Sequence, residues 1–154
     1  MAVSGIADLL KTFHDLGHMT SDLRDVAIEA MTLPRNAARR HAPVRSGLLQ
    51  STITVTELAE SSDKELHIGM GIFAEDAVNY PIYVEYGTGI YAENGQGRKT
   101  QWVYPCVTEG GLSFFTTSGM HPQPFIRPAW DEEKENAKNH LKQGIIAKLE
   151  RLKV

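Results

Sequence analysis

The apolar residues of this chain change their spacing twice, and this change most limits the folds open to it. In residues 1–42 they recur every three or four positions, which is typical of an amphipathic helix. Within residues 48–116 they alternate with polar residues, as in strands, and in residues 128–152 the helical spacing returns. This order predicts an α+β fold, with a mainly antiparallel sheet packed against a long N-terminal helix and a C-terminal helix.

The length of 154 residues suits a single domain, residues 1–154. Gly17 and the polar run after it predict a break in the first helix, and Pro34 predicts a kink or a restart. Pro43 and Gly47 end the helical region. An exposed loop is expected at 87–100 because it is rich in glycine. Strands are expected at Ser51–Leu58, Lys64–Phe73, Ile82–Tyr86, Trp102–Val107 and Leu112–Thr117.

Composition excludes several classes of protein. One cysteine rules out a disulfide framework within the chain, and the net charge of −3 argues against a general nucleic-acid binder. No window is apolar enough to cross a membrane, and no signal peptide is recognised. The charge is uneven, however. Four arginines and no acid lie between Glu29 and Glu57, whereas the span from Glu57 to Glu93 has eight acids and one base. Two patches that meet across neighbouring subunits would explain this, and so would ordinary solvated faces.

Each catalytic interpretation lacks a necessary part. The glycines of YGTG could belong to a phosphate loop, but the residues after them do not look helical. His14 and His18 have the spacing of a two-histidine metal site, without the glutamate expected beside the first. Cys106 has no activating neighbour in sequence. Glu85 and Glu93 could be paired carboxylates, but no pattern fixes their separation. We therefore expect no enzyme, catalytic residue, cofactor or metal.

Three stretches occur in an order that is familiar: HAPVRSGLLQSTI at 41–53, YPIYVEYGTG at 80–89 and QPFIRPAWDEE at 123–133. Together they resemble the tail-component family of tailed bacteriophages and prophages known as HK-ninety-seven gp-ten-like, over roughly residues 25–135. The first stretch departs from the family pattern at Ser46 and Leu49, where threonine and arginine are usual. Ser46 keeps a hydroxyl that can bond to local backbone.

The resemblance implies a structural virion protein of the head–tail junction, a neck or tail-completion protein. Its expected partners are portal, connector or head–tail adaptor proteins on one side and tail terminator or tail-tube proteins on the other. The resemblance also implies a homo-oligomeric ring, with a hexamer favoured, from subunits that can stay monomeric when free. The expected locations are the virion and, during assembly, the host cytoplasm. Passive contact with DNA in the channel is compatible with this role, and no membrane is involved.

Several residues are expected to shape interfaces and corners. Pro43 and Gly47 set the helix-to-strand angle, and Phe125 anchors the approach to the last helix. Arg127 is a candidate partner for Glu85, within about 6 Å. The residues predicted to serve as interface or structural sites are Arg35, Arg39, Arg40, Arg45, Glu85, Tyr86, Gly87, Thr88, Gly89, Phe125, Arg127 and Pro128.

A second hypothesis uses the same arginines differently. The segment Arg35–Arg45 could form a nucleic-acid-binding module, which would shift duplex DNA with a steep dependence on salt. A connector component would instead bind portal or adaptor proteins.

Overall fold

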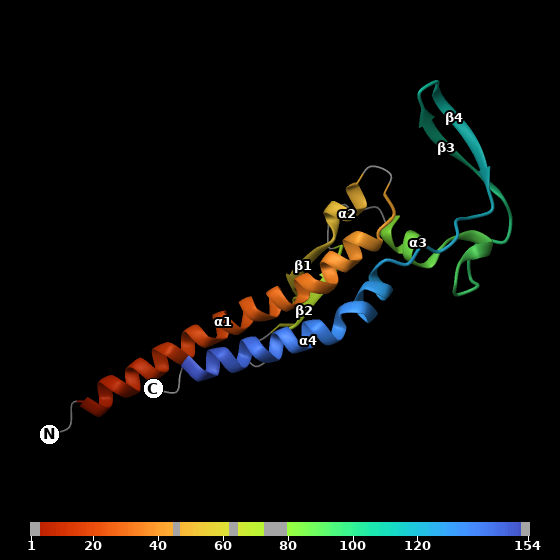
Figure 1. The fold of residues 1–154 in the computed structure, drawn as a ribbon. Helices are drawn as coiled ribbons and strands as arrows, with labels where there is room; N and C mark the ends of the chain where they lie inside the picture. The colour runs from red at the N-terminus through yellow and green to blue at the C-terminus, as the bar shows by residue number, and fades with distance from the viewer. Residues whose placement is uncertain (1–3, 45–46, 62–64, 73–79, 152–154) are drawn as a thin grey trace. The chain divides into compact units, whose positions relative to one another are not determined.

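A computed structural model describes residues 4–44, 47–61, 65–72 and 80–151, with only the backbone described for residues 4–21. The fold is α+β, with a long N-terminal helix, a C-terminal helix and two small antiparallel sheets (Figure 1). The chain divides into two compact units. The first comprises residues 1–37, 55–71 and 130–154, and the second comprises residues 38–54 and 72–129. The expectation of one domain stays a prediction.

In the first unit, α1 (Ser4–His41) packs against α4 (Ile126–Arg151). The two helices run antiparallel, because Asp22 pairs with Lys148 at 2.8 Å whereas Glu29, further along α1, lies 3.6 Å from His140. Between these contacts, Gly144 lies directly against Val26, leaving no room for a Cβ atom. Val26, Ala30, Ala37 and Ala137 are buried here. Small residues on facing helices let the two backbones approach closely.

The first unit also contains most of the smaller sheet, formed by β1 (Thr54–Glu57) and β2 (Ile68–Gly71). Arg24 on α1 forms an ion pair with Glu57 on β1, with 2.8 Å between nitrogen and oxygen. Beyond the sheet, the Leu58 amide donates a hydrogen bond to the carbonyl oxygen of His67. The ion pair joins β1 to α1, and the backbone hydrogen bond extends the pairing of the two strand segments.

The second unit is built from short helices and a β-hairpin. It contains α2 (Leu48–Thr52), α3 (Tyr80–Tyr86), the short 3₁₀ turn η1 (Gly89–Tyr91) and the strands β3 (Trp102–Thr108) and β4 (Gly111–Thr117). Its core is small and includes Ile53, Val84, Phe125 and Ala129. Arg39 ties α1 to this core, because its guanidinium donates hydrogen bonds of 3.2 and 2.8 Å to the carbonyl oxygen of Ile53.

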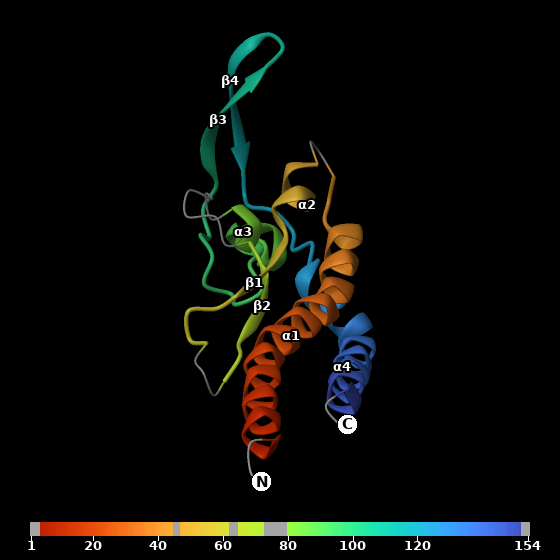
Figure 2. The ribbon, with the colours of Figure 1, turned by 90° about the vertical axis from the view of Figure 1, so that its left-hand side faces the viewer.

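The β3–β4 hairpin follows the predicted strand pair closely. Its register runs from Trp102 opposite Thr117 to Thr108 opposite Gly111. Gly111 has a φ of 101° at the turn, which glycine adopts without strain. Figures 1 and 2 show the far end of the hairpin standing clear of α2 and α3 of the same unit. Most of the hairpin's side chains are therefore exposed.

Three local predictions were wrong. Ile82–Tyr86 is part of helix α3 rather than a strand, and residues 48–52 form helix α2 rather than the start of the sheet. α1 is one helix from Ser4 to His41, so the predicted break after Gly17 and the predicted restart at Pro34 are wrong, whereas the alternative of a kink at Pro34 stays a prediction. The strands also form two separate pairs instead of one sheet. The residues expected to form the third strand are helical, and this helix, α3, lies between the two strand pairs in the sequence. None of the helices in the described ranges is long and apolar enough to span a membrane.

Candidate functional site

The candidate site lies in the second unit, where α3 meets the start of α4. Pro81 suits the first turn of α3, and Gly87, with a φ of 73°, follows its last residue in the left-handed conformation that ends many helices. The helix buries two adjacent residues, Val84 and Glu85. Val84 joins the apolar core. Glu85 is unusual because its side chain carries a charge and is only 6% exposed.

The Glu85 carboxylate caps the N-terminus of α4 from a distant part of the sequence. Its Oε2 atom accepts hydrogen bonds from the backbone N–H groups of Phe125 at 2.7 Å and Ile126 at 3.0 Å. Its Oε1 atom accepts one from the backbone N–H of Arg127 at 3.1 Å. The first amides of a helix have no partner within the helix, and its N-terminus carries a partial positive charge. A buried carboxylate therefore satisfies three donors at once.

The side chain of Arg127 completes the arrangement. Its Nε donates to Glu85 Oε1 at 2.9 Å, and its two terminal nitrogens donate to the two oxygens of Glu93 at 2.9 and 2.8 Å. The guanidinium also lies 4.6 Å from the centre of the Tyr86 ring. The predicted pairing of Glu85 with Arg127 is confirmed. We call Glu85, Glu93 and Arg127 the charged clamp.

The charges of the clamp stabilise one another. Burial alone would raise the pKa of Glu85, but the hydrogen bonds from Ile126, Phe125 and Arg127 outweigh it and lower that pKa below its ordinary value of 4.5. The hydrogen bond from Arg127 lowers the pKa of Glu93, and the two carboxylates together raise the pKa of Arg127. Both glutamates are therefore ionised near neutral pH.

The stretch Gly87–Thr88–Gly89 forms a corner beside the clamp. The amides of Thr88 and Ile90 donate to the carbonyl oxygens of Met120 at 2.9 Å and Ser118 at 3.0 Å. The hydroxyl of Thr88 accepts a hydrogen bond of 2.9 Å from the amide of Met120. Gly89 has a φ of 61°, and a Cβ atom there would overlap the Ser118 carbonyl group. The glycines thus permit a close backbone approach, as in a structural corner.

The contacts of the charged clamp join α3, the segment around Glu93 and the start of α4. Every hydrogen bond that the structure describes for the Glu85 carboxylate is accepted from a donor of the same unit. Glu85 and Glu93 were weighed as a catalytic pair whose separation nothing fixed, but Arg127 holds both of them. Such a carboxylate has no proton to transfer near neutral pH. Within the described ranges, no three His, Cys, Asp or Glu residues are grouped to hold a metal ion.

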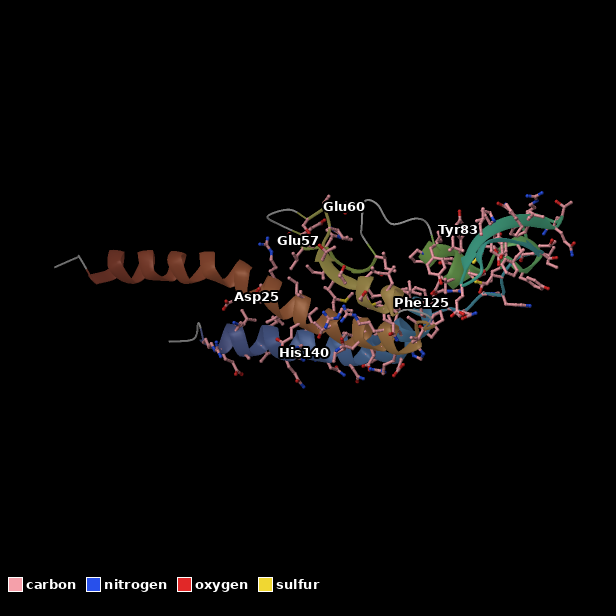
Figure 3. The ribbon with its side chains drawn as sticks, turned by 90° about the horizontal axis from the view of Figure 1, so that it is seen from above. Asp25, Glu57, Glu60, Tyr83, Phe125 and His140 are labelled. Carbon is pink, nitrogen blue, oxygen red and sulfur yellow. The ribbon has the colours of Figure 1, made fainter. Side chains whose placement is uncertain are left out.

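The remaining predicted site residues are distributed as follows. Phe125, which Figure 3 labels, is 1% exposed, so its predicted role as an anchor is confirmed. Pro128 lies in the first turn of α4. Arg39 is engaged with Ile53, Arg35 donates to the side chain of Asn36, and Arg40 is exposed. Arg45 lies outside the described residues. The interface roles of these residues stay predictions, as does the nucleic-acid hypothesis.

Among the described residues, at least four of the eight acids in the acidic region have partners within their own unit. Glu57 pairs with Arg24, Glu65 lies 3.6 Å from His67, and Glu85 and Glu93 both pair with Arg127. The pairing of Glu93 and the bond between Arg39 and the Ile53 carbonyl were not predicted. The sequence contains no signal for the Glu93 pairing, because Glu93 lies in a glycine-rich loop whose path the sequence pattern does not fix. The uneven charge is thus partly a consequence of internal pairing.

The second unit also carries a large uncovered apolar surface. Opposite residues of an antiparallel pair point to the same face, and successive residues alternate between the faces. One face of the hairpin is therefore formed by Val103, Pro105, Val107, Leu112, Phe114 and Thr116. We call it the apolar face, and its four large side chains Val103, Val107, Leu112 and Phe114 are 61–80% exposed. The other face is better covered and contains the contact between the Tyr104 and Phe115 rings.

A groove opens beside the base of this hairpin. It has a volume of about 820 Å³ and lies between α3, the glycine corner and the segment that leads into β3. Its apolar lining includes Ile82, Tyr83, Tyr86, Ala92 and Trp102. Tyr83 is labelled in Figure 3, on α3 near the start of the hairpin. We call this cavity the α3 groove.

Searches of known protein families, of curated proteins and of solved structures found no match to this chain.

Proposed function

We propose that this chain is a structural component of the head–tail junction of a tailed bacteriophage or prophage, a neck or tail-completion protein. It acts by forming a homo-oligomeric ring, with six copies favoured, that docks to connector and tail proteins. Portal or head–tail adaptor proteins are the proposed partners on one side, and tail terminator or tail-tube proteins on the other. The proposed locations are the virion and, during assembly, the host cytoplasm.

One observation carries the proposal: the uncovered apolar face of the β3–β4 hairpin. Four large apolar side chains on one face of a two-stranded ribbon are 61–80% exposed. Isolated hairpins are marginally stable in water, and contiguous exposed apolar surfaces mark sites of protein association. A protein that presents such a ribbon is suited to assembly with other chains.

The positions of the familiar stretches support the same proposal. Residues 80–89 and 123–133 are far apart in sequence, yet Glu85 and Arg127 join them at the charged clamp. Residues 41–53 end at Ile53, which is fully buried and accepts the hydrogen bonds of Arg39. The residues behind the resemblance thus serve to hold the second unit together. A unit that is held together internally and presents a hairpin suits a ring subunit, because pre-organised contact surfaces lower the cost of association.

The decisive experiment introduces an early nonsense codon into this gene within the phage genome that encodes it. Lysates are then examined by negative-stain electron microscopy. The expected result is DNA-filled heads and separate tails that fail to join, with joined particles restored when the chain is supplied from a plasmid. Normal numbers of joined, infectious virions without the chain would overturn the proposal. So would a block before heads fill with DNA.

A further inference from the structure

The apolar face of the hairpin and the α3 groove are two different surfaces on one chain. We propose that the hairpin of one copy packs its apolar face into the α3 groove of a neighbouring copy, with Glu109 at the hairpin turn beside Arg98 at the groove. This inference rests on the proposed ring-forming function, because it names the contact between neighbouring copies. Four properties of the two surfaces support the contact: their polarity, charge, reach and area.

The apolar character of both surfaces is the first of these properties. Five of the six residues on the apolar face are apolar, with Thr116 as the exception. Across the groove, Ile82, Tyr83 and Tyr86 of α3 are each about half exposed. A ribbon with one apolar face and a concave apolar surface bury each other's exposed area when they meet.

The second property is charge complementarity. Glu109 is the one charged residue between Trp102 and Thr117, and it lies at the hairpin turn. Arg98 is the one charged residue among those that line the groove. The Arg98 guanidinium lies 5.5 Å from the centre of the Trp102 ring, at the groove's edge. One acid on the inserted element and one base at the receiving surface fix the orientation of the contact.

Reach shows that the occupant comes from another copy. Trp102 lines the groove and is also the first residue of β3, so the hairpin begins at the groove and extends away from it. Val107 lies five residues further along the strand, or about 16 Å at ~3.3 Å per residue. The hairpin's own far end cannot return to the groove while its strands stay paired and extended. A second copy can supply the same face without breaking the pairing.

The area and the symmetry fit such a contact. The four large side chains together expose on the order of 400–500 Å², which is roughly half of the ~800 Å² that each partner typically buries. The contact joins two different surfaces, which is the head-to-tail type of interface. Repetition of such an interface closes into a ring when the rotation between copies permits it.

The test reverses the two charges separately and then combines the variants. Glu109→Arg and Arg98→Glu are each measured by sedimentation equilibrium from about 20 μM to 1 mM at low salt. Each single reversal should lower the association constant about five- to tenfold, because like charges then face each other. An equimolar mixture of the two variants should recover association, since alternating copies place opposite charges at every contact. Lys142→Glu and Glu150→Arg, which reverse exposed charges on α4, serve as controls and should leave association unchanged.

Three outcomes would overturn the inference. The free chain can be monomeric at low concentration, but the proposed contact requires association as the concentration rises, so a wild-type chain that is still monomeric at about 1 mM would overturn it. Charge reversals without effect on association would do the same, and so would a mixture that recovers no association. As an independent check on the apolar contact, Val107→Ser with Leu112→Ser should lower association at least about tenfold. Failure of this contact is distinguishable from failure of the proposed function. Heads and tails that fail to join without the chain, combined with association that ignores these variants, would refute the contact and keep the function.

Discussion

The charged clamp and the β3–β4 hairpin belong to the same unit and place their side chains in opposite ways. The clamp draws the charged groups of Glu85, Glu93 and Arg127 together and satisfies them within the unit. The hairpin instead leaves large apolar side chains in water. In an ordinary fold, burial favours the opposite assignment. From this difference we infer that the three charged residues of the clamp hold the unit's shape, whereas the apolar side chains of the hairpin are available to other chains.

Replacement of Glu85 should produce the largest loss of stability. Glu85→Gln removes the charge and puts an amide donor among three backbone N–H groups and the Arg127 side chain. Loss of a buried charged partner of this kind costs about 3–4 kcal/mol of unfolding free energy. Urea unfolding followed by circular dichroism measures it. Glu109→Gln, at the hairpin turn, is the matched control and should change the free energy by less than about 0.5 kcal/mol. Equal losses of stability at the two sites would show that the buried Glu85 contributes no more to stability than an exposed residue of the hairpin turn.

The glycine corner should be the next most sensitive place. Gly89→Ala adds a Cβ atom that overlaps the Ser118 carbonyl group, at a φ of 61°. We expect a loss of about 2–3 kcal/mol, since both the backbone conformation and the close approach are disturbed. Gly95→Ala is the control, because its φ is 68° but its Cβ would meet no atom within 4 Å. It should cost only about 1 kcal/mol. If the two variants lose the same stability, the close approach contributes nothing.

Acid should weaken the clamp in a defined range of pH. The pKa of Glu85 is lowered in the folded state, so its contribution to stability is present above its ordinary pKa of 4.5 and is lost as the pH falls through the folded-state value. Unfolding free energies measured from pH 7 to pH 3 should therefore fall more steeply below about pH 4.5 in the wild type than in Glu85→Gln. Parallel curves for the two proteins would show that Glu85 is not the group responsible.

The sequence predicted the helices at both ends and the β3–β4 hairpin, because each has a long or local pattern. It also predicted the pairing of Glu85 with Arg127, since a lone acid among aromatic residues needs a partner. It failed at Ile82–Tyr86, where alternation of apolar residues suggested a strand. Pro81 near the start and Gly87 just after the end are helix signals that favoured α3. Val84 and Glu85 are both buried although adjacent, which the alternation of a strand excludes and which positions i+3 and i+4 of a helix allow.

The division of the strands into two pairs could not be predicted, for a different reason. β3 and β4 are joined by a short turn, so their pairing is encoded locally. Whether they also join β1 and β2 depends on contacts between residues far apart in sequence, and period-two alternation contains no information about partners. The clamp was only half predicted for the same reason. Glu93 lies in a glycine-rich loop, and its bond to Arg127 becomes evident only when the corner brings the loop back.

The smallest effect on stability is expected at the hairpin itself, and it tests directly whether the apolar face is uncovered while the clamp is satisfied. In the isolated chain, Val107→Ser with Leu112→Ser replaces side chains that are already exposed, so little buried area is lost. The free energy of unfolding should change by less than about 0.5 kcal/mol. If the double variant instead unfolds as readily as Glu85→Gln, the apolar face is packed against the chain's own residues in solution. The hairpin would then be part of the core, and the contrast between a satisfied clamp and an uncovered ribbon would disappear.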